Sequence, residues 1–125
     1  MATTHAAAVR TAIANLVVDS IDAGAGAGTL EFQTSGNVEV ATLTFSDPAF
    51  GAASGPTATA DTITDDTDAT GGTIAKAVAK DSDGNAVVTC SVTGSGGGGD
   101  IELSSVVISA HQTVGVDSLT YTAPV

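Results

Sequence analysis

The chain has 125 residues and a formal charge of −11 at pH 7, with three Lys and Arg residues against 14 Asp and Glu residues. This length fits one domain over residues 1–125, and the shortage of cations excludes direct nucleic-acid binding, which needs clustered Lys and Arg side chains on phosphates. Hydrophobic residues make up 42% of the chain but aromatic residues only 3%, and many of the others are alanines, so we expect a thin core that association with other subunits supplements.

The N-terminal segment does not have the pattern of a secretion signal. Arg10 lies inside its apolar stretch, and Asp19 and Asp22 close that stretch. Elsewhere no apolar run approaches the roughly 18 residues that a membrane-spanning helix needs. We therefore expect a protein that is made and kept in a cytoplasm and has no membrane partner.

The spacing of apolar residues predicts an N-terminal helix over about residues 4–22. Thr3 or Thr4 is the expected N-cap, and the Ala/Gly alternation of residues 23–28 ends the helix. Its apolar stripe consists of Val9, Ile13, Leu16, Val17 and Ile21. Such a stripe needs a surface to cover, either the body of the same domain or a neighbouring subunit. The candidate interface residues are Val9, Ile13, Leu16 and Val17.

The remainder of the chain, about residues 29–123, consists of short alternating runs rich in Thr and Val, which are typical of β-strands. Turn residues 34–37 join the first two runs as a hairpin, and residues 81–85 join a later pair. The predicted strands are 30–33, 38–46, 57–64, 73–80, 86–93, 101–110 and 117–122. About seven strands at this spacing predict a mainly β fold, a β-sandwich or flattened barrel, with one N-terminal α-helix.

The later turn is also the best candidate for a metal site. Asp81, Asp83 and Asn85 place oxygen ligands at alternating positions, as Ca²⁺ prefers. The bidentate Glu of a calcium-binding loop is missing, and Asp, Gly and Asn are the residues that tight turns favour in any case. The sequence therefore favours a plain hairpin turn without a metal or other cofactor.

The residues that commonly carry catalysis are few and scattered. His5 and His111 have no partner at metal-ligand spacing, so we expect surface or interface positions for both. Cys90 alternates with valines, which indicates a small buried residue that has no intrachain disulfide. Residues 94–99 are rich in glycine but lack the Gly-Lys-Ser/Thr ending of a phosphate-binding loop. With no Gly-x-Ser-x-Gly elbow either, the sequence predicts a protein that is not an enzyme.

Several segments resemble small virion proteins of tailed bacteriophages. The likeness is carried by residues 6–15, by Asp22-Ala23-Gly24, Gly28-Thr29-Leu30-Glu31-Phe32, Asp47-Pro48-Ala49-Phe50-Gly51 and Lys80-Asp81-Ser82-Asp83-Gly84, and by the terminal Ser118-Leu119-Thr120-Tyr121-Thr122. Proteins of this kind decorate or cement capsids, and others form tails. The resemblance implies a structural component of the virion.

Within that class we expect a capsid decoration protein that binds the outer surface of a phage head. A β-body, an attachment helix and an acidic exterior suit this role, and contacts repeated over a lattice reinforce one another. Its partners would be the major capsid protein or another virion protein, together with copies of itself. One alternative is a tail-tube or tail-tip subunit, in which edge strands extend a sheet between copies. Another is a bacterial surface or adhesion module.

Overall fold

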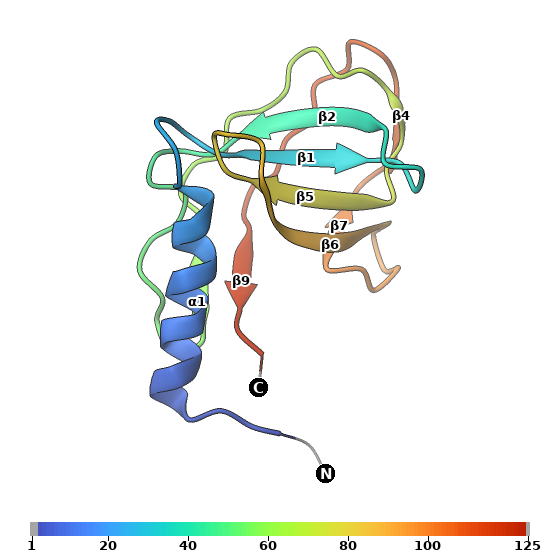
Figure 1. Ribbon diagram of the computed structural model, residues 1–125. Helices are drawn as coiled ribbons and strands as arrows, with labels where there is room; N and C mark the ends of the chain where they lie inside the picture. Colours follow the sequence, from blue (N-terminus) through green and yellow to red (C-terminus); the bar gives the residue numbers. More distant parts are fainter. Residues whose placement is uncertain (1–2, 125) are drawn as a thin grey trace.

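A computed structural model describes residues 3–124, in which a curled sheet forms the body and a helix extends from it (Figure 1). These residues contain one helix and nine strands. The elements are α1 (Ala7–Ile21), β1 (Thr29–Gln33), β2 (Glu39–Thr44), β3 (Thr57–Thr59), β4 (Gly72–Thr73), β5 (Lys76–Lys80), β6 (Ala86–Gly94), β7 (Ile101–Leu103), β8 (Val107–Ile108) and β9 (Thr120–Thr122). The fold is mainly β with one N-terminal helix, consistent with the predicted β-sandwich or flattened barrel.

The main sheet has five strands in the order β2-β1-β5-β6-β7, and two-stranded sheets β3-β9 and β4-β8 accompany it. Strand β1 pairs antiparallel with both β2 and β5, and β5 pairs antiparallel with β6. The last pair, β6 and β7, is parallel, with Val92 opposite Ile101. Parallel neighbours ordinarily need a connection of a dozen or more residues, whereas here residues 95–100 make it.

Both predicted hairpins are present. Between β1 and β2, the Thr34 backbone N–H donates to the Val38 carbonyl at 2.9 Å, and Asn37 adopts the left-handed conformation with φ 69°. The register shifts just after Phe32, which leaves Val40 as an extra residue in β2. Because of this bulge, Val40 and its neighbour Ala41 are both fully buried.

The helix begins later than predicted. Its N-cap is Ala6, whose side chain makes no capping hydrogen bond, so the expectation that Thr3 or Thr4 caps the helix is wrong. Residues 3–6 are exposed and lie outside any regular element. Without packing against the body, an additional helical turn would not offset its conformational entropy.

Two predicted strands are each divided. The run 73–80 separates into β4 and β5 because the Ile74 N–H donates to Val106 while the Ala75 N–H donates to Gln33, so the chain passes from one sheet to another. The run 101–110 separates into β7 and β8 around Ser104 and Ser105. The predicted strands 38–46, 57–64 and 117–122 shorten to Glu39–Thr44, Thr57–Thr59 and Thr120–Thr122.

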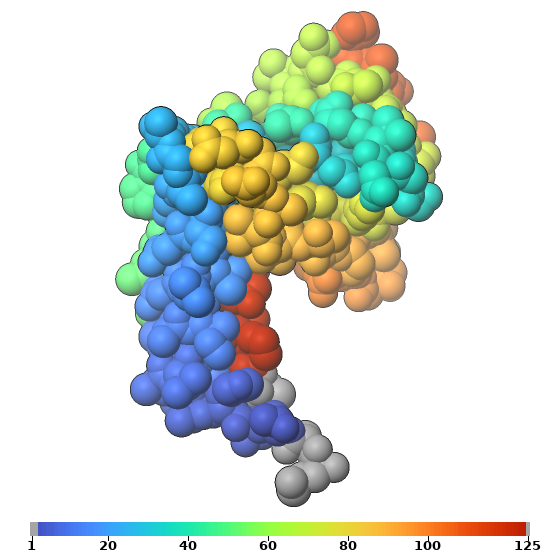
Figure 2. Space-filling model, viewed as in Figure 1, coloured from blue at the N-terminus to red at the C-terminus, as the bar shows by residue number. Residues whose placement is uncertain are grey.

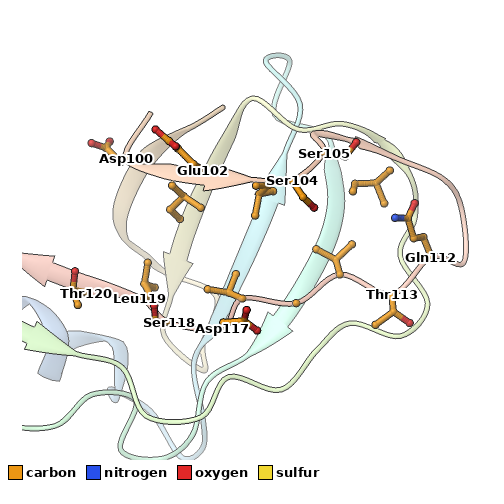
Figure 3. A pocket seen from close by; sticks show the side chains of 16 residues that line it. Asp100, Glu102, Ser104, Ser105, Gln112, Thr113, Asp117, Ser118, Leu119 and Thr120 are labelled. Atoms are coloured by element: carbon orange, nitrogen blue, oxygen red, sulfur yellow. The ribbon is translucent and has the colours of Figure 1, made fainter. Parts of the chain in front are cut away.

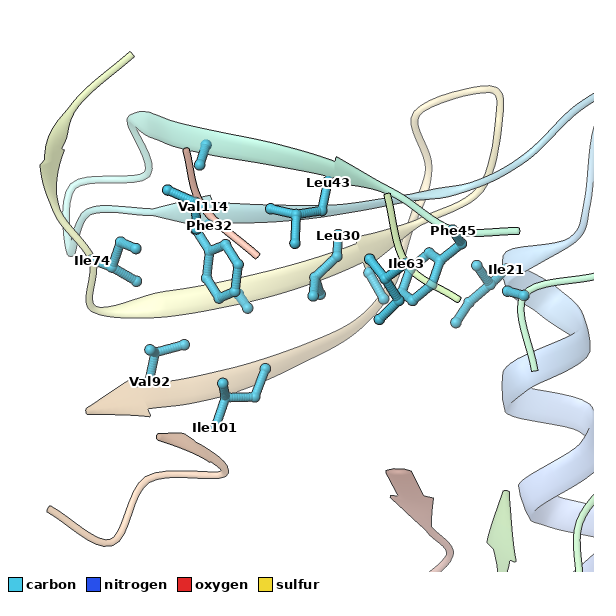
Figure 4. Close-up of a cluster of buried hydrophobic side chains, with 14 of the residues drawn as sticks. Ile21, Leu30, Phe32, Leu43, Phe45, Ile63, Ile74, Val92, Ile101 and Val114 are labelled. Atoms are coloured by element: carbon cyan, nitrogen blue, oxygen red, sulfur yellow. The ribbon is translucent and has the colours of Figure 1, made fainter. Parts of the chain in front are cut away.

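The core lies on the concave face of the curled sheet. Leu30, Phe32 and Leu43 point to that face together (Figure 4), and each is at most 1% exposed. From the helix, Val18 and Ile21 join the same cluster. The lower part of α1 lies with β3 and β9 away from the sheet. These three elements, α1, β3 and β9, are called the leg below.

Candidate interaction surfaces

The side chain of Asp81 is occupied by the turn that it begins. Its carboxylate accepts hydrogen bonds from the backbone N–H groups of Asp83 at 3.0 Å and Asn85 at 2.9 Å, and from Asn85 Nδ2 at 3.2 Å. The Asn85 N–H is the main cause of a pKa of Asp81 below its ordinary value. In the described part of the chain no group of three or more His, Cys, Asp or Glu side chains is arranged to hold a metal. The candidates Asp81, Asp83 and Asn85 thus form a hydrogen-bonded hairpin turn.

The histidines lie on the surface. His111 Nδ1 is 2.5 Å from Asp68 Oδ1, and both side chains are largely exposed. No local sequence pattern indicates this pair, because 43 positions separate the two residues. His5 is also exposed and lies in the segment before α1. The fold therefore brings His111 to a carboxylate, in a solvent-exposed pair.

Cys90 lies half-buried in β6, and its surroundings favour the protonated thiol. Burial, and after it the negative charge of Asp100, raises the pKa of Cys90 to about 11. Because the thiolate is the nucleophile, the protonated thiol at neutral pH is a poor one. The predicted burial is met only in part, because Cys90 is partly buried and packs against the core cluster between Val88, which is also partly buried, and Val92, which is buried.

The glycine-rich loop between β6 and β7 folds around a carboxylate of its own chain. The N–H groups of Gly96 and Gly98 donate to Glu102 at 3.0 and 3.1 Å, and the Gly99 N–H donates to Thr93 Oγ1 at 3.0 Å. Gly96 and Gly98 have positive φ values of 83° and 81°, which glycine adopts without strain. The amides that would have to cradle a phosphate are thus directed at Glu102 and Thr93.

Several polar side chains of the helix hydrogen-bond to other parts of the chain. Arg10 donates from Nε to the Pro124 carbonyl and from Nη2 to the Ala123 carbonyl, both at 3.0 Å. One turn along, Asn15 Oδ1 accepts the N–H of Ala53 at 2.8 Å. Two more hydrogen bonds tie the loop before β3 to this part of the chain: Thr11 Oγ1 donates to the Gly55 carbonyl, and the Ala49 N–H donates to Asp22 Oδ1 at the end of the helix. These bonds join α1 to residues that precede β3 and follow β9.

The predicted apolar stripe of the helix is divided between inside and outside. Ile21 is 2% exposed and belongs to the core, whereas Leu16 is 69% and Val9 45% exposed. Ile13 and Val17 are intermediate. Ala14 and Val18, which the periodicity did not single out, are buried instead. In Figure 2 the helix forms a continuous outer ridge of the leg, and Val9 and Leu16 lie seven residues apart, on one face of it.

A second surface feature lies at the end of the main sheet. A cavity of about 530 Å³ separates β7 from the segment 112–120. Figure 3 shows Asp100, Glu102 and Ser104 on the β7 side and Asp117 to Thr120 on the other. A second cavity of about 360 Å³ lies between α1, the sheet and β9, and Leu119 and Tyr121 help to line it. Neither cavity has a local signal in the sequence, because segments far apart in the chain form the walls.

Comparison with known proteins finds no family model, no curated protein and no solved structure that matches the chain. Within residues 3–124, no helix has both the length and the apolar composition that crossing a membrane requires.

Proposed function

We propose that this chain is a non-enzymatic structural protein of a bacteriophage virion that decorates the outside of the head and stabilises the shell. One observation carries the proposal. Along α1, polar Arg10 and Asn15 face the chain's own backbone, while apolar Leu16 and Val9 face outward. Exposed apolar side chains grouped on one face mark interaction sites. Here the helix that presents them is held in place by the hydrogen bonds of Arg10 and Asn15 to the rest of the leg.

The arrangement suits attachment to a larger partner. Burying apolar surface against a partner contributes roughly 25 cal/mol of binding free energy per Å² removed from water. Val9 and Leu16, with the partly exposed Ile13 and Val17 beside them, would therefore give each copy a modest affinity. In a lattice, each bound copy holds its neighbours near their own sites. The major capsid protein, or another virion protein, is the partner that offers such a repeated surface.

The acidic charge fits the same role. A formal charge of −11 keeps the free protein soluble while it is made in the host cytoplasm. It also disfavours contact with the packaged nucleic acid, whose phosphates carry the same sign. We therefore place the protein on the outer face of the virion, with the helix toward the shell.

Particles released by the bacterium that carries the gene test this role directly. Mass spectrometry should find the chain in purified particles, and cryo-electron microscopy should show its curled sheet on the outer surface of the head, with α1 against the shell. Density along the tail would favour the alternative of a tail-tube or tail-tip subunit. Absence from the particles would contradict both virion roles.

A double variant tests the surface. Val9→Asp with Leu16→Asp should weaken binding to shells that lack the protein by at least about tenfold, because carboxylates buried without partners cost several kcal/mol. Val107→Asp is the matched control, since Val107 is 64% exposed but lies in β8. Equal binding by the double variant and the control would overturn the assignment of the helix face.

A further inference from the structure

The two edges of the five-stranded sheet differ. The outer edge of β2 is covered, because Thr44 and Thr64 exchange backbone hydrogen bonds at 3.2 and 2.8 Å, and the N–H groups of Thr70 and Gly71 donate to Val40. The outer edge of β7 has no such cover: in the part of the chain that the structure describes, no backbone hydrogen bond joins Ile101–Leu103 to the facing segment 114–120. The gap between these two segments is called the seam below.

The seam has a floor of apolar side chains, among them Ile101, Leu103 and Leu119, whereas the surface that its larger cavity exposes is mostly polar. The cavities of about 530 and 360 Å³ share walls at Asp100 and Ile101 on one side and at Leu119 and Thr120 on the other. Together they run from β7 toward the leg, where Figure 2 shows a hollow below the body. Ile101 is only 7% exposed and belongs to the core cluster, against which Leu119 packs.

We propose that the seam binds an extended segment of a partner protein, which pairs with β7 as a sixth strand and carries alternating apolar and basic side chains. An unpaired sheet edge offers backbone donors and acceptors to such a strand, and alternate side chains supply the selectivity. About five residues, the ordinary length of a strand, suffice. The proposal stands on the seam alone and does not depend on the virion role.

The alternation follows from strand geometry. Successive side chains of a strand point to opposite faces, so every second residue of the guest faces the apolar floor. One of them reaches the smaller cavity, which Leu119, Tyr121 and Cys90 help to line. The residues between them face outward, toward the rim of the seam.

The charge of the rim argues for a basic partner and against a second copy. Asp100, Glu102 and Asp117 are exposed along the seam. Ser91 donates hydrogen bonds to Asp100, and Gly96 and Gly98 donate to Glu102, but these neutral donors leave the negative charge uncompensated. The chain's own cations are engaged elsewhere: Arg10 binds C-terminal carbonyls, Lys80 lies 2.5 Å from Glu31, and Lys76 donates to Asn37. A second copy would bring another charge of −11, whereas Lys or Arg side chains would complement the rim.

Amide hydrogen exchange on the full chain tests whether the edge is open. At least one β7 amide should exchange as fast as an exposed loop amide in the free protein, while the amides of Thr44 and Thr64 at the covered edge should be protected. Protection of all three β7 amides in the free monomer would show that the chain closes its own seam and would overturn the proposal.

A synthetic peptide tests the partner chemistry. The probe is acetyl-Lys-Val-Thr-Val-Lys-Val-Thr-Val-Lys-amide, and its matched controls carry Glu in place of every Lys or Pro in place of the second Val. The Lys peptide should shift NMR signals of β7 and residues 114–120, slow β7 exchange at least about tenfold, and lose affinity with added salt. No binding at about 1 mM peptide, or equal binding of the Glu peptide, would overturn the proposal.

Variants locate the binding site. Asp117→Lys should lower the affinity for the Lys peptide at least about fivefold. Asp19→Lys makes the same charge change on the exposed side of the helix and should change that affinity less than about twofold. Ser118→Trp, which places a bulky ring in the seam, should also weaken binding. The proposal fails if both seam variants bind the Lys peptide as tightly as Asp19→Lys does. It also fails if the chain forms dimers and the peptide does not displace one copy from the other.

Discussion

The sheet body and the leg are held together by different means. In the body, large apolar side chains such as Phe32, Leu30 and Leu43 are fully buried on one face of the sheet. In the leg, Arg10 and Asn15 hold the helix to backbone groups of the segments around β3 and β9. Burial of aliphatic and aromatic groups contributes more per side chain than exposed hydrogen bonds do, so the body supplies most of the stability.

The difference explains why apolar side chains are exposed on the leg. A helix that is attached through polar bonds leaves its apolar residues available to a partner, and Leu16 and Val9 take that position. Toward the C-terminal end of the same helix, apolar side chains are buried instead, because Val18 and Ile21 belong to the core. The helix is thus anchored in the body at its C-terminal end and exposes apolar side chains nearer its N-terminal end.

The largest effect is expected in the body. Phe32→Ala should lower the free energy of unfolding by about 3–5 kcal/mol, because Phe32 is 0% exposed and its removal leaves a cavity. Urea unfolding followed by circular dichroism measures the change. Val38→Ala, at a residue 60% exposed, is the control and should cost less than about 0.5 kcal/mol. Equal costs would mean that the body is not the stabilising region.

Ile21→Ala tests where the helix enters the body. Ile21 is 2% exposed and belongs to the core cluster, so its truncation should cost about 2–5 kcal/mol. The same urea titration measures it. A cost below that of an exposed substitution would show that the helix is attached by its polar bonds alone.

Much of the body was predictable because its signals are local. The turn residues 34–37 and 81–85, with alternating runs beside them, specify hairpins within a few positions. The inward face of the helix could not be predicted in this way. Arg10 hydrogen-bonds to residues more than 110 positions away, and the helical periodicity considers only apolar side chains. The seam was missed for a related reason, since it depends on the parallel pairing of β7 with β6.

Arg10→Met should loosen the leg and leave the body intact. The variant keeps most of the aliphatic stem but removes the hydrogen bonds to Ala123 and Pro124, which together contribute about 1–3 kcal/mol. Amides of β9, and the Ala123 N–H that donates to Pro56, should then exchange faster. If β1 and β5 amides accelerate equally, the two regions unfold as one unit and the comparison above is wrong.

Acid should weaken the body rather than the leg. Hydrogen bonds from the Asn85 N–H and its neighbours lower the pKa of Asp81. Burial alone would raise the pKa of Glu31, but bonds from Lys80 and Gln33 outweigh it and lower that pKa as well. A carboxylate whose pKa is lowered by folding stabilises the fold at pH values above its ordinary pKa. This contribution is lost as the pH falls through the folded-state pKa.

The melting temperature should therefore be steady between about pH 7 and pH 5 and fall below about pH 4, where the ordinary carboxyl values lie. Asp81→Asn should be less stable than the natural chain at neutral pH and should lose less on acidification. Arg10 binds carbonyls of the leg and neither of these two carboxylates, so Arg10→Met should retain the full acid sensitivity. An acid response of Asp81→Asn as steep as that of the natural chain would exclude the turn as its source.

The smallest effect on stability is expected where the effect on binding is largest. Leu16→Ala should change the free energy of unfolding by less than about 0.5 kcal/mol, because Leu16 is 69% exposed and alanine favours a helix at least as well as leucine does. Ile21→Ala, five residues along the same helix, is the matched comparison. A cost for Leu16→Ala near that of Ile21→Ala would mean that the outer face of the helix packs against the chain itself, and the leg would then have no surface to offer a shell.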